Sequence, residues 1–467
     1  MNTLELTGIG DTICAVSTPQ GRGGIAVIRV SGPEAMDIVQ RCWQGKPLVD
    51  MSSHTVHLGH IVDTAGDVLD QAVLTVYRAP NSFTGEDVVE LACHGSTWIQ
   101  QQVIQTLIDA GCRHATAGEF TRRAFANGRM DLSQAEAVAD VIEAQSRAAH
   151  HVAMSQMRGR YSDELKSLRD KLLHFVALIE LELDFSEEDV TFADRGEVTA
   201  LARDIHALIS RLADSYRDGN AIRNGMPVAI VGQTNAGKST LLNALLRDDR
   251  ALVSDIHGTT RDTIEDTVVV GGTLFRFIDT AGIRQSSDTV EQMGIERSWQ
   301  ALDKATIVLW VIDSTRPDGI EDMARDILAR CEGKRLVAVL NKTDLADNSS
   351  DVQALLTGIL PEDVPVLGIC AKCDSDVETL RALIVETAAL PDVDSDAVIV
   401  TNARHYQALT RARAAITRTI DGLDNGLSGD LLDQDIRECL HWLGEITGEI
   451  TTDNILGEIF AHFCIGK

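Results

Sequence analysis

A glycine-rich segment near the middle of the chain has the residues needed to hold phosphate groups. Residues 232–240 read GQTNAGKST, between the apolar runs MPVAIV and LLNALL. Gly232 and Gly237 let backbone amides face phosphate oxygens at the start of a helix. We expect Lys238 to reach the β- and γ-phosphates and Ser239 to bind Mg²⁺. An ordinary glycine turn is the weaker interpretation, because strand, complete motif and helix occur together.

A second segment, RLVAVLNKTD, could read the base. It looks like a buried strand ending in Asn341–Asp344. The Asp344 carboxylate can accept hydrogen bonds from the N1–H and 2-amino groups of guanine. Adenine lacks that pair of donors and would leave Asp344 unpaired, which discriminates strongly in a buried site. The segment predicts a guanine nucleotide.

Two further segments lie between these motifs. FRFIDTAG ends in Asp279–Gly282, which suits a carboxylate near Mg²⁺ and a glycine amide facing the γ-phosphate. HGTTRD offers Thr260 as a mobile Mg²⁺ ligand. Four motifs in this order, on these elements, predict a GTPase.

The position that orients water in Ras-like GTPases holds Ile283 here, which cannot do so. No arginine finger is obvious in the sequence, although Arg261 and Arg284 are nearby candidates. Asn235 could hold a monovalent cation near the phosphates in place of that charge. It could equally be an asparagine that stabilises the loop.

Three regions of the chain, which differ in their pattern of apolar residues, must position these motifs. Short apolar strands (24–30, 72–77 and 88–93) predict an N-terminal α+β domain over 1–125. Helical periodicity predicts a helical domain in two parts, 126–220 and 389–467, with a capping box at Ser133–Glu136. A Ras-like α/β domain over 221–388 interrupts it. The predicted fold class is therefore mixed α/β and α, with the GTPase domain inserted into the helical one.

Composition limits the alternatives. The formal net charge of -28 disfavours nonspecific binding to nucleic acid. Nine scattered cysteines suggest a reducing compartment, and neither a secretory leader nor a membrane-length apolar stretch is visible, so we expect a cytoplasmic protein without membrane contact. Cys370 and Cys373 have the spacing of a redox motif, but without a thioredoxin-like context we interpret that spacing as chance.

The motifs GxxNAGKST, SDIHGTTRD, DTAGI with VEQMGIERS, NKTD and the terminal FCIGK together resemble the MnmE (TrmE) family of tRNA-modifying GTPases. TPQGRGGIAVIRVSG, APNSFTGEDVVEL and GEFTRRAFANGRMDLSQAEAVADVIEA extend the resemblance over essentially the full chain. The P-loop is generic to many GTPases, whereas the N-terminal blocks and the C-terminal motif are specific to this family.

The resemblance implies potassium activation, with K⁺ in the role of an arginine finger. Its ligands map to Asn235, Ser254, Ile256 and Thr259, and the residue that positions water maps to Glu291. Cys370 stands where the family has Ser, but the Ala371 amide that should face the guanine oxygen remains. Motifs and resemblance together assign nucleotide contacts to Asn235, Ala236, Gly237, Lys238, Ser239, Thr240, Ser254, Asp255, Ile256, His257, Gly258, Thr259, Thr260, Asp279, Thr280, Ala281, Gly282, Asn341, Lys342, Thr343, Asp344, Cys370, Ala371 and Lys372, with Ser239 and Thr260 on Mg²⁺.

The resemblance also implies a dimeric N-terminal domain that binds 5-formyl- or methylene-tetrahydrofolate through Arg29, Glu90, Arg129 and Lys467. A carboxylate at Glu90 suits the paired N–H donors of a pterin. Without the resemblance, an ion pair with a neighbouring cation is the simpler interpretation. Arg129 stands where the family has Lys, so charge is kept while shape differs. We expect Cys464 to pack as a small apolar side chain, although its position permits a chemical role.

The implied activity is addition of an aminomethyl or carboxymethylaminomethyl group at C5 of the wobble uridine of certain tRNAs. The implied assembly is a homodimer that forms a heterotetramer with the flavin-dependent MnmG protein, which holds most of the tRNA. One alternative is a regulatory or ribosome-assembly GTPase without modification chemistry, and another is a folate enzyme regulated by GTP. A single P-loop and the lack of a basic tail or KH-type loop weigh against the first.

Overall fold

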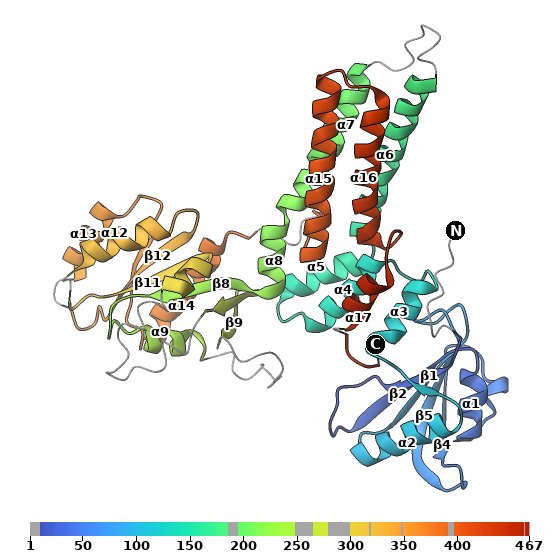
Figure 1. The fold of residues 1–467 in the computed structure, drawn as a ribbon. Coiled ribbons are helices and arrows are strands. Elements are labelled where there is room, and N and C mark those ends of the chain that lie inside the picture. Colours follow the sequence, from blue (N-terminus) through green and yellow to red (C-terminus); the bar gives the residue numbers. More distant parts are fainter. Residues whose placement is uncertain are drawn as a thin grey trace. The chain divides into compact units, whose positions relative to one another are not determined.

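The computed structural model describes residues 10–184, 195–247, 265–278, 299–316, 319–346, 349–390, 397–461 and 463–466 (Figure 1). The chain divides into two compact units. One comprises Met1–Ala139, Ser155–His206 and Arg411–Lys467, and the other comprises Asp140–Met154 and Ala207–Thr410. No helix among the described residues is both long enough and apolar enough to cross a membrane.

The first unit contains a seven-stranded sheet in the order β3-β4-β5-β6-β2-β1-β7, antiparallel except for the β1–β7 pair. Alternating residues of its strands form a core with α1 and α2, so both helices cover the same face. The elements are β1 Ile13–Val16, β2 Ile25–Ser31, α1 Ala35–Arg41, β3 Trp43–Gln44, a short 3₁₀ helix Leu48–Asp50, β4 Thr55–Val62, β5 Val68–Tyr77, β6 Val88–His94, α2 Thr97–Asp109, β7 Arg113–His114 and α3 Glu119–Ala126. The three strands predicted from the sequence are confirmed as β2, β5 and β6.

Helices follow this sheet in the chain and return after the second sheet. They are α4 Leu132–Glu143, α5 Arg147–Met157, α6 Arg160–Asp184, α7 Arg195–Asp214, α8 Tyr216–Asn224, α15 Ala403–Asp424, α16 Gly429–Thr447 and α17 Asp453–Ala461. The predicted periodicity is confirmed, because Leu165, Leu168, Leu172 and Ile179 all lie in the buried stripe of α6. Helix α16 packs along α6, and the Arg418 side chain of α15 reaches acids of α16.

The predicted capping box at Ser133–Glu136 is wrong by two residues. The box is formed by Asp131 and Gln134: the Gln134 N–H donates to Asp131 Oδ1 and the Asp131 N–H donates to Gln134 Oε1, each at 2.9 Å. Ser133 already lies inside α4 and donates its hydroxyl to Asp131. An aspartate satisfies the free amides at a helix start as well as a serine does, and here it stands one residue before the helix.

The second unit contains a six-stranded sheet in the order β13-β12-β11-β8-β10-β9, parallel except for the β9–β10 hairpin. All seven residues of β11 are buried, as expected for a central parallel strand covered on both faces. The elements are β8 Met226–Val231, α9 Lys238–Leu245, β9 Asp266–Val270, β10 Thr273–Phe277, β11 Ile307–Asp313, α12 Ile320–Arg330, β12 Arg335–Asn341, α13 Ser349–Ile359, β13 Val366–Gly368 and α14 Asp374–Ala388. The predicted fold class is confirmed.

Candidate functional site

The phosphate-loop motif lies between β8 and α9, as the sequence predicts. Gly232 has a φ of +151°, and a Cβ there would lie 2.1 Å from the Val311 carbonyl oxygen, so no larger residue fits. Gly237 is left-handed and precedes the first residue of α9. The free amides at the N-terminus of α9 therefore face the loop, which is the geometry that attracts phosphate.

Lys238 folds back over this loop. Its ammonium donates to the carbonyl oxygens of Gly232 at 2.7 Å and Gln233 at 2.8 Å. Burial lowers the pKa of Lys238 because desolvation penalises the charged form. A phosphate would offset that penalty, since it would place negative charge beside the ammonium.

Asn341 joins the phosphate loop to the loop after β13. Its Nδ2 donates to the Ala236 carbonyl at 2.8 Å, and its Oδ1 accepts the Ala371 N–H at 3.1 Å. Asn341 is buried at the end of β12, so both bonds are shielded from water. The amide expected to face a guanine oxygen is thus engaged by Asn341 in this structure.

Lys342 makes a second link, and it involves a residue that the sequence reasoning missed. Its ammonium donates to the Asn235 carbonyl at 2.8 Å and pairs with Asp313 Oδ2 at 2.5 Å. Burial raises the pKa of Asp313, but hydrogen bonds from Lys342 and Thr315 outweigh burial and hold the pKa below its ordinary value. The sequence did contain a sign of this residue, because Asp313 ends the apolar run IVLWVID in the way that Asn341 ends its own strand.

Asp344, the predicted guanine reader, is exposed and makes no hydrogen bond to any residue that the structure describes. The discrimination expected of a buried carboxylate therefore depends on the base covering it. Thr343 lies beside it, with its N–H on the Ile369 carbonyl at 3.3 Å. Lys372 is also exposed, in the turn that follows Ala371.

Asn235 has a left-handed backbone (φ 64°), which asparagine tolerates better than most residues. Its side chain is exposed and forms no hydrogen bond within the described parts of the chain. The conformation suits a loop residue, while the unpaired amide suits a ligand, so both interpretations of Asn235 stand. The assigned residues Ser254 to Thr260, Asp279 to Gly282, Glu291 and Lys467 lie outside the described residues.

The N-terminal sheet brings Arg29 and Glu90 together on the face opposite its helices. The two residues are direct partners on β2 and β6, and Arg29 Nε and Nη2 lie 2.9 and 2.8 Å from Glu90 Oε1. The Arg29 guanidinium also lies 5.3 Å from the Phe83 ring centroid and 5.6 Å from that of Phe120. Both predicted folate contacts are therefore half-buried and paired with each other.

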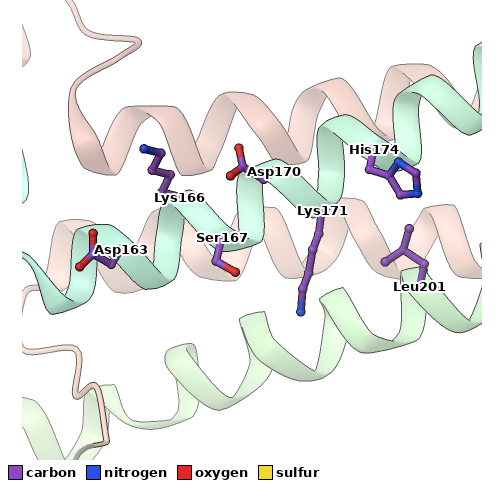
Figure 2. A pocket seen from close by; sticks show the side chains of 7 residues that line it. All are labelled: Asp163, Lys166, Ser167, Asp170, Lys171, His174 and Leu201. Atoms are coloured by element: carbon purple, nitrogen blue, oxygen red, sulfur yellow. The ribbon is translucent and has the colours of Figure 1, made fainter.

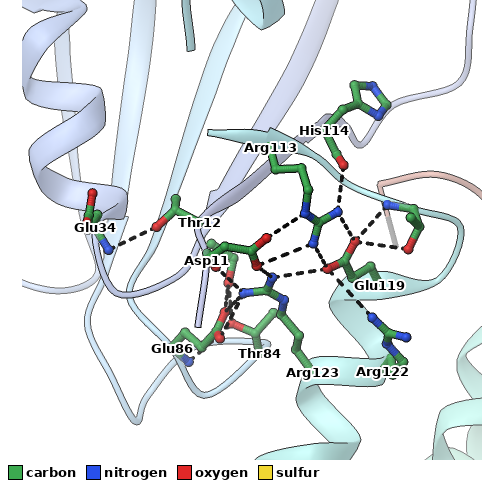
Figure 3. A network of polar contacts seen from close by, with 12 residues as sticks. Asp11, Thr12, Glu34, Thr84, Glu86, Arg113, His114, Glu119, Arg122 and Arg123 are labelled. Carbon is green, nitrogen blue, oxygen red and sulfur yellow. Dashed lines mark hydrogen bonds and ion pairs between the residues drawn. The ribbon is translucent and has the colours of Figure 1, made fainter. Parts of the chain in front are cut away.

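A network of charges anchors the elements beside this pair (Figure 3). Buried Arg123 donates to Asp11 Oδ1 at 2.6 Å, to Glu119 Oε1 at 3.1 Å and to Glu86 Oε1 at 3.1 Å. Arg113 bonds Asp11 and Glu119 from the other side. Burial raises the pKa of Glu119, but the hydrogen bonds from Arg113 and its other partners lower it to about 2. The network fixes α3, which carries Phe120, against the loop that carries Phe83.

Arg129 is exposed, and its side chain lies against Gly85 in that same loop. Two residues near the C-terminus contact segments next to the first sheet. Ile465 pairs with Ala117 in an isolated bridge, and Ser17 Oγ donates to the Gly466 carbonyl at 3.0 Å. A Cβ at Gly466 would lie 2.2 Å from the Val16 carbonyl oxygen. Ile465 and Gly466 thus dock by their backbone.

The expected packing of Cys464 is wrong. Its thiol is exposed, because the backbone contacts of Ile465 and Gly466 fix the segment while Gly466 takes the buried position. An exposed thiol is open to chemistry or to a ligand.

A groove of about 490 Å³ runs along α6 and α7 (Figure 2). Lysines and aspartates share its lining, so it carries no net preference for one sign of charge. None of its residues belongs to the predicted sites. Its lining is Asp163, Lys166, Ser167, Asp170, Lys171, His174 and Leu201.

Comparison with known proteins covers nearly the whole chain. The family model described as "MnmE helical domain" matches residues 132–464, and "GTP-binding protein TrmE N-terminus" matches residues 12–129. The chain is 54% identical over 464 residues to the tRNA modification GTPase MnmE of Bacteroides thetaiotaomicron, which covers 98% of this chain and 99% of that protein. It is 53% identical over 463 residues to the same-named protein of Parabacteroides distasonis, at 98% and 100% coverage.

Among solved structures, the G domain of the T. maritima FeoB iron transporter is 24% identical and covers 35% of this chain and 98% of that one, with a TM-score of 0.26. The resemblance read from the sequence motifs is confirmed by the full-length relatives. The chain belongs to the MnmE family, whose relatives carry the name tRNA modification GTPase.

Proposed function

We propose that the chain is a potassium-activated GTPase that modifies C5 of the wobble uridine of certain tRNAs. The observation that carries the GTPase part is the position of Asn341, which ties the phosphate loop to the loop after β13. Asp344 stands three residues later with a free carboxylate. This arrangement suits one ligand that bears phosphates at one end and guanine at the other.

The residues present fit the ions that such hydrolysis uses. Ser239 lies in the first turn of α9 and supplies a hydroxyl for Mg²⁺, while the Asn235 amide supplies an oxygen for K⁺. Bound there, the two cations would neutralise charge that develops on the phosphates. Lys238 holds the β- and γ-phosphates, and Glu291 orients the attacking water.

The N-terminal domain is proposed to bind a tetrahydrofolate one-carbon donor, either 5-formyl- or methylene-tetrahydrofolate. Glu90 keeps its Oε2 outside the bonds to Arg29, which use Oε1 alone. A pterin edge could therefore add N–H donors to Glu90 without breaking the ion pair. Arg129 and Lys467 are the remaining proposed contacts.

The proposed assembly is a homodimer that joins the flavin-dependent MnmG protein in a heterotetramer. A net charge of -28 supports a division of labour in which the partner holds most of the tRNA. The partner's flavin would also supply the redox chemistry of the modification.

Mass spectrometry of wobble nucleosides tests the proposal directly. A strain lacking this chain should lose the C5 modification, and expression of the chain should restore it. Restoration should fail with Asp344→Asn, whereas the exposed Glu34→Gln substitution in the N-terminal domain should restore it fully. Unchanged nucleosides in the deletion strain, with ribosome-assembly intermediates accumulating, would favour the regulatory alternative.

A further inference from the structure

The loop after β13 carries two cysteines whose thiols have no part in the proposed function. Cys370, Ala371, Lys372 and Cys373 form a turn that the Cys373 N–H closes by donating to the Cys370 carbonyl at 2.8 Å. Cys373 is exposed at the start of α14 and Cys370 is partly exposed. We propose that Cys370 and Cys373 form a reversible disulfide that weakens guanine-nucleotide binding. This inference rests on the proposed GTP site.

The turn brings the two residues within bonding range. A four-residue turn closed in this way holds its end Cα atoms less than about 7 Å apart. A disulfide needs a Cα separation of roughly 4.4–6.8 Å, so the two ranges overlap. Both thiols are reduced in this structure, and Cys373 Sγ lies 3.2 Å from Ser375 Oγ. The spacing of Cys370 and Cys373 in the sequence suggested chance, because it does not reveal the turn that brings them together.

Exposure separates this pair from most other thiols of the chain. The thiols of Cys14, Cys42, Cys93, Cys112, Cys331 and Cys439 are buried. Only Cys464 is comparably open among the nine, and it has no cysteine beside it in sequence. A small peroxide would therefore meet the loop pair and Cys464 first.

The oxidation balances with one peroxide molecule. The Cys373 thiolate attacks a peroxide oxygen, the O–O bond breaks, and the released hydroxide takes a proton to give water and a sulfenic acid. The Cys370 thiolate then attacks that sulfur and displaces a second hydroxide, which also becomes water. Two thiols lose two electrons, and peroxide is reduced to two waters. A dithiol reductant reverses the reaction by exchange.

The disulfide would act on the nucleotide site through two hydrogen bonds. The Cys370 N–H donates to Asp376 Oδ2 at 2.8 Å, and the Ala371 N–H donates to Asn341 Oδ1 at 3.1 Å. An S–S bond of about 2.05 Å also fixes the Cβ–S–S–Cβ dihedral at about 90°, and the turn must adapt to that geometry, which shifts both amides relative to their acceptors. Asn341 also holds the phosphate loop, so the disturbance reaches both ends of the site. By linkage, bound nucleotide should favour the dithiol over the disulfide at equilibrium.

The test uses the full-length protein with and without hydrogen peroxide. After free thiols are blocked, peptide mapping locates any disulfide, and fluorescent GDP measures affinity before oxidation, after it, and after dithiothreitol. We expect a Cys370–Cys373 disulfide and about a tenfold loss of GDP affinity, the scale of one or two lost hydrogen bonds. Dithiothreitol should restore the affinity, and saturating GDP should shift the dithiol–disulfide equilibrium in a thiol redox buffer towards the dithiol.

Cys373→Ser is the matched control, because serine keeps the exposed position before α14 and starts helices well. This variant should retain its GDP affinity after peroxide treatment. A disulfide with unchanged affinity, oxidation that stops at sulfinic acid, or a Cys373→Ser variant that loses affinity like the unmodified chain would each overturn the inference. Failure of the reduced protein to bind GDP would instead reject the proposed GTP site, while the mapping would still test the disulfide.

Discussion

Gly237 lies so close to Asn341 that a Cβ atom on Gly237 would stand 2.1 Å from Asn341 Nδ2. That nitrogen donates to the carbonyl of Ala236, the residue before Gly237. The glycine therefore meets two requirements at once: it permits a left-handed backbone, and it makes room for the side chain that joins the two loops.

Gly237→Ala should reduce GDP affinity by about a hundredfold, because the strained backbone and the displaced Asn341 together cost a few kcal/mol. Equilibrium titration with fluorescent GDP measures this. Gly358→Ala is the control, since Gly358 lies in α13 with open space around it and should keep full affinity. Equal GDP affinity of the two variants would show that Asn341 does not need a glycine at position 237.

Asp344→Asn should move the preference from GTP towards xanthosine triphosphate. The carboxylate that accepts two donors becomes an amide that accepts one and donates one, which matches the changed edge of xanthine. Competition between the two nucleotides for the purified variant gives the ratio of affinities. Because Asp344 is exposed here, the fold should be unaffected. Unchanged GTP turnover would remove Asp344 from the site.

Glu90→Ala should abolish binding of 5-formyltetrahydrofolate and leave GTP binding intact. The substitution also leaves Arg29 without its partner between two aromatic rings, so folding needs a separate check. Glu90→Gln supplies it, because the amide oxygen can still accept from Arg29 while its NH₂ opposes the pterin donors. Calorimetry that finds folate affinity intact in Glu90→Gln would reject Glu90 as the pterin contact.

The sequence was most informative where one local pattern decides one structure. The buried β11 reads as an unbroken apolar run, and the phosphate loop needs glycines at fixed positions whatever surrounds it. Both could be predicted without knowledge of the neighbours. The capping box was misplaced by two residues because Asp131 and Ser133 are both good residues for starting a helix.

Contacts between distant segments could not be predicted. Arg123 binds Asp11, 112 residues earlier, and Arg29 finds Glu90 only because β2 and β6 are neighbours in the sheet. A carboxylate in an apolar strand favours an ion pair on the residues alone, but its partner cannot be named until the strand order is known. Cys464 was misjudged for a related reason, since the backbone contacts that expose its thiol come from residues far away in the sequence.

Glu119→Gln should destabilise the N-terminal domain near pH 7 by about 3–5 kcal/mol, because it removes one partner from buried charged groups. The folded-state pKa of about 2 lies below the ordinary value of 4.5, so the Glu119 contribution is complete above pH 4.5 and is lost as pH falls towards 2. Calorimetry across that pH range should find that the stabilities of Glu119→Gln and the unmodified chain converge as the pH falls. Glu34→Gln, an exposed change in the same domain, should alter stability little at any pH. A constant difference between Glu119→Gln and the unmodified chain would exclude this linkage.

Hydrolysis of GTP should be fast in K⁺ and slow in Na⁺, whose smaller radius fits a K⁺-sized set of ligands badly. The prediction follows from Ile283, which cannot orient water, and from the free amide of Asn235 beside the phosphate loop. Asn235→Ala should lose the K⁺ response yet still bind GDP, because Lys238 and the backbone amides remain.

The backbone of Asn235 calls for a second variant, since alanine is strained at a φ of 64°. Asn235→Gly removes the same amide without that strain, so both variants should lose the K⁺ response if the amide binds the ion. Glu291→Ala should differ: it should keep K⁺-dependent association of two GTPase domains with GDP and aluminium fluoride, yet hydrolyse slowly for want of an oriented water. Single-turnover rates in matched KCl and NaCl, with size analysis of the analogue complex, measure all of these. Equal rates in both salts for the unmodified chain would reject the cation and return attention to Arg261 and Arg284, whereas a K⁺ response retained in Asn235→Gly would assign the ion to other ligands.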